Sequence, residues 1–139
     1  SPPATISCNN SCAGTYTPSP VDKCSCVVPY EGVLVFRAPH FSTLQNISYF
    51  QELVSYIADQ LEIRESQVVI TSKSFNAQNQ LFVSISIFPN TGALKWTRDD
   101  VMRFSSALGS NGIHIYIFGP PDFNQYVYPY DLPGESAII

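Results

Sequence analysis

The chain has 139 residues, of which 45% are hydrophobic and 13% charged, and its formal net charge at pH 7 is −4. This length predicts one domain, and the hydrophobic content is too high for a disordered chain. The negative charge argues against nucleic acid and anionic lipid as partners, because both require a basic surface. Composition therefore indicates a folded α+β domain without naming its function.

The first 26 residues hold all the cysteines of the chain: Cys8, Cys12, Cys24 and Cys26. An even and clustered set of cysteines is typical of a chain that forms disulfides in an oxidising compartment. Two Asn-x-Ser sequons, starting at Asn9 and Asn46, are candidate N-glycosylation sites. We therefore expect an extracellular chain that passes through the secretory pathway.

The spacing of the cysteines restricts how they pair. In an extended segment the Cα atoms of Cys24 and Cys26 would be about 6.6 Å apart, near the long limit for a disulfide. Each is therefore expected to pair with Cys8 or Cys12. A hairpin through residues 13–23 would give Cys8–Cys26 and Cys12–Cys24, while sequence alone leaves three connectivities open. Because this spacing is poor for zinc, we expect no metal and no other cofactor.

The first half of the chain predicts a loop, a strand and a helix. Residues 1–30 are rich in Pro, Ser, Thr and Cys, which favours loops held by the cysteines. Residues 33–37 predict a short strand, and residues 48–63 an amphipathic helix opened by a capping box of Ser48 and Gln51. The apolar face of this helix is expected to contain Phe50, Leu53, Val54, Ile57 and Leu61.

The second half predicts three strands and a helix. Residues 67–74 and 81–88 alternate as strands, and the inward residues of the second are Leu81, Val83, Ile85 and Ile87. Thr97 with Asp100 resembles a capping box that opens a second helix, and Gly109 can end it. Alternating isoleucines predict a fourth strand over residues 113–117. We also expect Leu53 and Ile57 of the first helix to pack on the inward residues of the third strand.

The predicted order is β-α-β-β-α-β, the ferredoxin-like arrangement. It implies an α+β fold with a four-stranded antiparallel sheet in the spatial order 4-1-3-2 and two helices on one face. Three segments follow from this reading: a stapled segment over 1–30, the domain over 31–120, and a Pro-rich and aromatic tail over 121–139. Ser-Pro-Pro at the start and Leu132–Gly134 near the end have linker composition, so we expect a part of a longer protein.

Four short stretches resemble one family: Cys24–Tyr30 (CSCVVPY), Phe36–Ser42 (FRAPHFS), Tyr49–Leu53 (YFQEL) and Ile87–Pro89 (IFP). They are similar to the extracellular domain that lies between the leucine-rich repeats and the membrane helix of plant receptor-like kinases. The resemblance spans roughly residues 8–118. It implies a fold similar to SEA-type domains on the extracellular side of the plasma membrane.

The resemblance also implies a role. The chain would be a non-catalytic spacer and protein-interaction surface in signal perception, and the Ser/Thr kinase would belong to the intracellular part of the parent protein. The implied partners are the neighbouring leucine-rich-repeat domain and a co-receptor. The alternative role is extracellular sensing of oxidants or quinones through the cysteine cluster.

Enzymatic and RNA-binding readings find little support in the sequence. A hydrolase would need Ser or Asp beside His40 or His114, and no Gly-x-Ser-x-Gly elbow occurs. Gly109–Ser110 resembles the cleavage step of self-cleaving SEA domains, but it follows the second helix instead of lying between the second and third strands. The strand over 81–88 has aromatic residues but lacks the Lys, Arg and Gly of RNA-binding sheets. Asp99–Asp100 is typical of a helix N-terminus.

The sheet face away from the helices is the predicted interaction surface. Alternation on the last two strands directs four aromatic side chains to that face: Phe82, Phe88, Tyr116 and Phe118. A contiguous aromatic patch usually contacts a partner, although the termini of the chain can also cover it. Arg37 ends an apolar strand and is expected to pair with an acidic side chain or with backbone.

Overall fold

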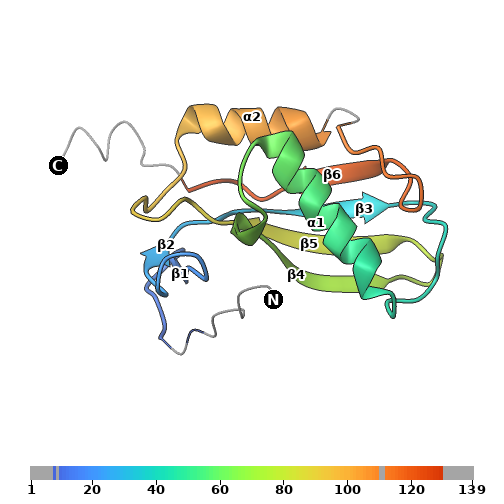
Figure 1. Ribbon diagram of the computed structural model, residues 1–139, viewed down its shortest axis with the longest axis horizontal. Coiled ribbons are helices and arrows are strands. Elements are labelled where there is room, and N and C mark those ends of the chain that lie inside the picture. Colours follow the sequence, from blue (N-terminus) through green and yellow to red (C-terminus); the bar gives the residue numbers. More distant parts are fainter. Residues whose placement is uncertain (1–7, 9, 110–111, 130–139) are drawn as a thin grey trace.

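The computed structural model describes residue 8, residues 10–109 and residues 112–129. The main body is a four-stranded antiparallel sheet in the order β4-β5-β3-β6. Its strands are β3 (Tyr30–Phe36), β4 (Val68–Phe75), β5 (Leu81–Ile87) and β6 (Pro121–Gln125). Two helices, α1 (Ile47–Leu61) and α2 (Arg98–Gly109), lie on the same side of this sheet (Figure 1). The remaining elements are β1 (Thr17–Pro18), β2 (Cys26–Val27) and the 3₁₀ helix η1 (Glu65–Gln67).

The strand order agrees with the predicted order 4-1-3-2, but the fourth strand lies elsewhere in the sequence. Residues 113–117 form a loop and a turn, in which the N–H groups of Phe118 and Gly119 both donate to the carbonyl of Ile115 at 3.0 Å. Gly119 then adopts a φ of +72°, which lets the chain turn into β6. The predicted strand at 113–117 is therefore wrong, and residues 121–125, which the sequence analysis assigned to the tail, form β6 instead.

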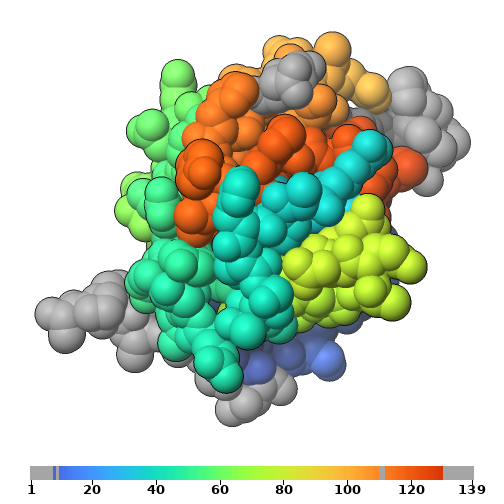
Figure 2. Space-filling model, turned by 90° about the vertical axis from the view of Figure 1, so that its right-hand side faces the viewer, coloured from blue at the N-terminus to red at the C-terminus, as the bar shows by residue number. Residues whose placement is uncertain are grey.

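The alternation of isoleucines has a different cause from sheet pairing. Ile113 and Ile115 are buried at the margin of the core, and Phe118 is completely buried among aromatic rings, with its ring centroid 4.8 Å from that of Phe36. Period-two burial thus arises in a loop that packs on the core without joining the sheet. Figure 2 shows this end from outside, where the loop after α2 (orange) lies against the loop after β3 (cyan and teal).

The two helices begin at well-defined caps. Asn46, and not Ser48, is the N-cap of α1, because its Oδ1 accepts the N–H of Ser48 at 3.1 Å. The predicted capping box of Ser48 and Gln51 is therefore wrong by two residues, since Asn caps a helix as well as Ser does. The predicted box of α2 is confirmed: the N–H of Asp100 donates to Thr97 Oγ1 at 3.1 Å, and the Thr97 hydroxyl donates to Asp100 Oδ2 at 2.9 Å.

The core lies between the sheet and the helices, as the apolar patterns predict. Leu53 and Ile57 of α1 and Val83 of β5 are fully buried, and Ile85 is 1% exposed. All four belong to one hydrophobic cluster that also includes Phe104 and Leu108 of α2. Burial of this kind contributes about 1.5–3 kcal/mol for each large apolar side chain, so this cluster holds both helices on the sheet.

Candidate functional site

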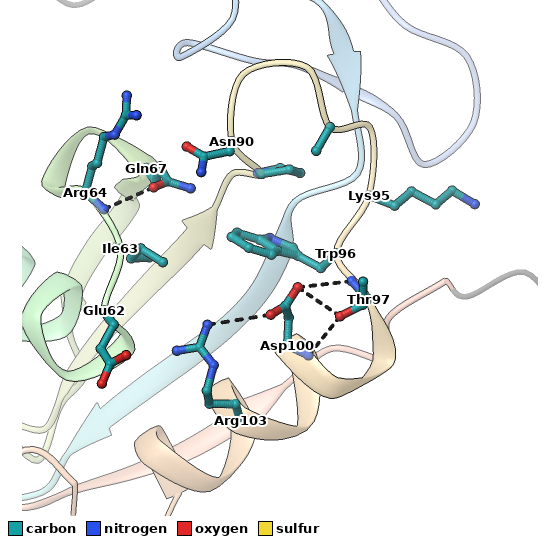
Figure 3. A pocket seen from close by; sticks show the side chains of 12 residues that line it. Glu62, Ile63, Arg64, Gln67, Asn90, Lys95, Trp96, Thr97, Asp100 and Arg103 are labelled. Atoms are coloured by element: carbon teal, nitrogen blue, oxygen red, sulfur yellow. Dashed lines mark hydrogen bonds and ion pairs between the residues drawn. The ribbon is translucent and has the colours of Figure 1, made fainter.

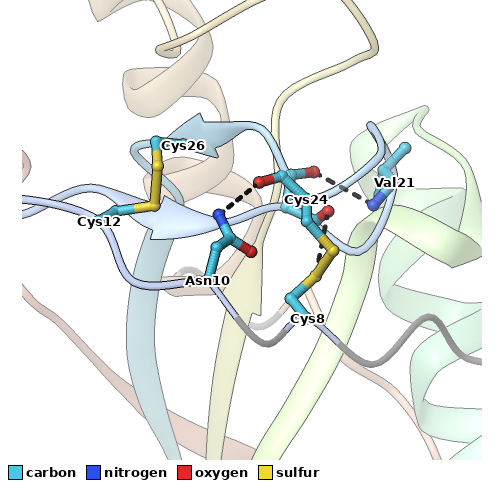
Figure 4. The surroundings of a disulfide bond; sticks show 7 residues. Cys8, Asn10, Cys12, Val21, Cys24 and Cys26 are labelled. Carbon is cyan, nitrogen blue, oxygen red and sulfur yellow. Dashed lines mark hydrogen bonds between the residues drawn. A yellow bond between two sulfur atoms is a disulfide. The ribbon is translucent and has the colours of Figure 1, made fainter.

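The disulfide-bonded N-terminal segment is the first candidate site (Figure 4). Cys8 pairs with Cys24 and Cys12 pairs with Cys26, with Cα–Cα distances of 5.6 and 5.7 Å. Asn10 donates from Nδ2 to the carbonyl of Cys24 at 2.9 Å. Between β1 and β2 the chain forms a tight loop that is closed by Ser19, whose N–H donates to the Ser25 carbonyl at 2.8 Å.

The pairing between the two cysteine segments is confirmed, while the favoured connectivity is wrong. A simple hairpin would have joined Cys8 to Cys26 and Cys12 to Cys24. The chain makes two reversals instead. A turn at residues 13–16, closed by the N–H of Tyr16 on the Ala13 carbonyl at 3.1 Å, reverses the chain before β1. Because β1 and β2 are antiparallel, the two cysteine segments run in the same direction. The first cysteine of one segment therefore pairs with the first of the other, and the second with the second.

The stapled segment is attached to the end of the sheet where β3 begins. Val27 and Val28 are each 1% exposed, and the N–H of Val28 donates to the carbonyl of Leu94 at 2.8 Å. Asp22 reinforces the contact by accepting the N–H of Gly92 through Oδ2 at 3.0 Å. The disulfides therefore fix a segment that also has its own contacts with the loop between β5 and α2.

Tyr128 ties the other end of the described chain to the same place. Its hydroxyl donates to the carbonyl of Val28 at 2.8 Å and accepts the N–H of Trp96 at 2.8 Å. Trp96 in turn donates from Nε1 to the carbonyl of Ile87 at 2.8 Å. One phenol thus joins the segment before β3, the loop before α2 and the segment after β6. We call this arrangement, made by the disulfides, Val28, Trp96 and Tyr128, the stapled junction.

The sequence analysis did not identify Trp96 and Tyr128. Neither residue lies in a stretch whose apolar residues repeat with a helical or strand period, so periodicity does not identify either of them. The usable signal is composition, since Trp96 is the single tryptophan and Tyr128 lies in an aromatic stretch. A Trp or Tyr ring that packs on a core needs a partner for its polar group, and both the half-buried Trp96 and the buried Tyr128 have one here.

A shallow polar cleft of about 520 Å³ lies between the end of α1 and the start of α2 (Figure 3). Two of the charged side chains that line it, Asp100 and Arg103, make contacts within the fold. Asp100 caps α2 and lies 3.6 Å from Arg103, and Arg103 also donates to the carbonyl of Leu61. These contacts connect α2 to the end of α1, which is a structural task.

The two histidines lie on the surface, away from this cleft. The ring of His40 stacks on that of Tyr116, with centroids 4.7 Å apart and planes at 8°. His114 is exposed, and its backbone N–H donates to the hydroxyl of Tyr56 at 3.2 Å. Within the described part of the chain, neither imidazole has a recorded hydrogen bond to Ser or Asp. Ser110 of the Gly-Ser step lies outside the described residues.

The predicted aromatic patch does not form. Phe118 is completely buried, Phe88 is 5% exposed, and Tyr116 is 80% exposed on the turn beside His40. Only Phe82 lies on the open sheet face, where it is half-buried. Phe88, Tyr116 and Phe118 lie outside the strands. Alternation of apolar residues there does not show which face of the sheet a side chain occupies.

The partner of Arg37 and the position of Asn46 are now defined. Arg37 forms a 2.6 Å ion pair with Asp122 of β6, and both side chains are largely exposed. Such a pair contributes at most about 1 kcal/mol. Asn46 is exposed at the N-cap of α1, which leaves its glycosylation a prediction, and Asn9 lies outside the described residues.

No group of three or more His, Cys, Asp or Glu side chains that could hold a metal ion occurs among residues 8, 10–109 and 112–129. None of the helices in that same part of the chain is long and apolar enough to cross a membrane. The two disulfides indicate folding in an oxidising compartment, as in secreted proteins.

Comparisons with protein-family models, with curated proteins and with solved structures find no match for this chain.

Proposed function

We propose that this chain is a non-catalytic extracellular module of a plant leucine-rich-repeat receptor-like kinase, with a SEA-like, ferredoxin-like fold. In this proposal the module lies between the repeats and the membrane helix. It acts as a spacer and as an interaction surface for the repeat domain or a co-receptor. The four sequence stretches that resemble this family are the basis for the parent class.

The observation that carries the spacer role is the stapled junction. Two disulfides fix the segment that enters the sheet, and the hydroxyl of Tyr128 bonds that segment to the one that leaves it. Domains attached before and after such a module would have their separation set by bonded groups, not by a flexible linker. A rigid connection of this kind suits a module that positions a ligand-binding domain above a membrane.

A surface-labelling experiment tests the location. The parent protein would carry an epitope inserted after Gln78, an exposed residue in the turn between β4 and β5, and would be expressed in plant protoplasts. We expect antibody staining of intact cells. Staining only after permeabilisation would contradict the proposal.

A replacement experiment tests the spacer role. A parent protein in which a Gly/Ser linker of matched length replaces residues 8–129 should reach the surface but lose ligand-induced signalling. Full signalling by this variant would contradict the spacer role.

Redox sensing is the second candidate function. The observation that favours it is that each of the four cysteines is partly accessible to solvent. A sensing disulfide would have a reduction potential well above the roughly −300 mV of stable structural disulfides. Titration with glutathione buffers, followed by thiol labelling, distinguishes the two roles: both bridges should stay oxidised in a spacer, and one should open in a sensor.

A further inference from the structure

The two edges of the sheet differ in their capacity to pair with another strand. β6 is five residues long and begins at Pro121, which has no N–H to donate. β4 is eight residues long, contains no proline, and pairs with β5 on one side only among the described strands. Four consecutive residues of the strand, from Thr71 to Ser74, are exposed. The edge of β4 is therefore the better template for an added strand.

An apolar groove of about 480 Å³ runs beside this edge, between β4 and α1. α1 contributes Ile47, Phe50 and Val54, and β4 contributes Ile70 and Lys73. Ile47 is 65% exposed, which is high for an isoleucine at the rim of an apolar groove. In Figure 1 the first turns of α1 lie over β4, which forms the lower edge of the sheet.

The register of β4 shows which of its side chains face the groove beside an added strand. Ile70 pairs with Ile85, and Lys73 pairs with Val83, so both side chains face the helices. Side chains of a neighbouring strand alternate between the two faces with the same period of two. Every second residue of a strand added to β4 would therefore point toward Ile47 and Val54.

The charges around the groove favour one kind of occupant. Lys73 lies with its Nζ 4.4 Å from the centroid of the Phe50 ring, and Glu65 lines the groove from η1, before the start of β4. A segment with an acidic residue near Lys73 and a basic residue near Glu65 would complement both ends.

We propose that the edge of β4 and the α1/β4 groove bind an extended segment of a partner protein by strand addition. The segment runs antiparallel to β4, places apolar side chains in the groove, and carries an acidic residue at its start and a basic residue at its end. Main-chain hydrogen bonds supply affinity and the groove supplies selectivity. This inference rests on the proposed interaction role and names the surface and the partner chemistry.

Amide chemical shifts of the ¹⁵N-labelled chain, titrated with the peptide Asp-Thr-Val-Thr-Val-Thr-Lys, whose charged residues and valines share one face of a strand, test the proposal. We expect saturable shifts in β4 and in the first turn of α1. Two further peptides carry N-methyl groups on either the valines or the threonines. One of them should lose binding, because alternate N–H groups of a strand point to the same edge.

Variants test the groove separately from the edge. Ile47→Glu should weaken binding about tenfold, equivalent to about 1.4 kcal/mol, while leaving the fold intact, because an acid is favourable at a helix N-terminus. Met102→Glu, at a side chain of α2 that is 62% exposed, is the matched control and should bind normally. Lys73→Glu should prefer a peptide in which a lysine replaces the starting aspartate and the final lysine is kept, because that peptide places a base near both Glu65 and the new glutamate.

Several results would overturn the proposal. These are the absence of saturable shifts at millimolar peptide, shifts confined to β6, equal binding of both methylated peptides, or a dimer formed through β4. The titration uses the isolated chain, so its outcome does not depend on the cellular location tested above. If the peptide binds but intact cells are not stained, this inference holds and the proposed function is wrong. If intact cells are stained but the peptide does not bind, the proposed function holds and this inference is wrong.

Discussion

The ring of Phe123 lies directly over Gly32, so that a Cβ added to Gly32 would fall 2.6 Å from two ring carbons and 2.9 Å from the carbonyl oxygen of Asn124. Gly32 pairs with Gln125, and Phe123 pairs with Leu34, two residues further along β3 and therefore on the same face as Gly32. The missing side chain is therefore what allows β6 to pack on β3 with its only aromatic ring turned inward.

Gly32→Ala should destabilise the fold by about 1–3 kcal/mol, because the ring has to move within a packed core. Gly109→Ala is the matched control, since a Cβ there meets nothing within 4 Å. Thermal melts followed by circular dichroism would measure both variants. Equal melting temperatures would show that the Phe123 ring does not pack on Gly32.

Paired cysteine substitutions test the connectivity. Cys12→Ser with Cys26→Ser removes one bridge and leaves Cys8 and Cys24 to pair, so thiol titration should find no free thiol. Cys12→Ser with Cys24→Ser removes one partner from each bridge, so Cys8 and Cys26 should react. The first variant should also lose about 3 kcal/mol of stability, as expected for a loop of this length. The opposite thiol counts would support the hairpin connectivity.

Tyr128→Phe should cost about 1–3 kcal/mol, because it removes the hydroxyl that satisfies the carbonyl of Val28 and the N–H of Trp96. Hydrogen exchange at the Trp96 amide should accelerate in the same variant. Tyr126→Phe, at a ring that is 55% exposed, is the control and should leave both measurements unchanged. An unchanged Trp96 exchange rate in Tyr128→Phe would contradict the described junction.

Asn46 should carry a glycan when the chain is produced in insect or plant cells, and intact mass would show it. Asn46→Asp should remove the glycan and keep the helix cap, since an aspartate oxygen can accept the Ser48 N–H. Asn46→Ala should remove both and lower stability by about 1 kcal/mol relative to Asn46→Asp. A wild-type mass without glycan would contradict the prediction.

Residues whose burial follows a helical or strand period were placed correctly from sequence. The face of α1 through Leu53 and Ile57 and the inward side of β5 follow from spacing, because burial against one flat partner enforces a fixed period. The cap at Thr97 also follows, because its hydrogen bonds are local in sequence.

Features that depend on tertiary packing could not be predicted in this way. Ile113 and Ile115 alternate like a strand but lie in a loop, and β6 begins at the second of two consecutive prolines, which argue against a strand. The disulfide connectivity depends on a chain reversal at residues 13–16, and no local pattern specifies its direction. The hydroxyl of Tyr128 bonds to residues that are 100 and 32 positions away in the sequence, so only the folded structure brings these groups together.

The adjacency of β3 and β6 determines how the domain would respond to mechanical tension. The chain enters the sheet at Tyr30 and leaves it at Gln125, and these positions lie at the same end of two paired antiparallel strands. A force that pulls these ends apart would act along the hydrogen bonds, which would break one after another from that end. The bond from Tyr128 to Val28 lies ahead of the first pair and would have to break first. Single-molecule stretching should therefore show Tyr128→Phe opening at a lower force than the wild-type chain, and equal forces would place the mechanical resistance elsewhere.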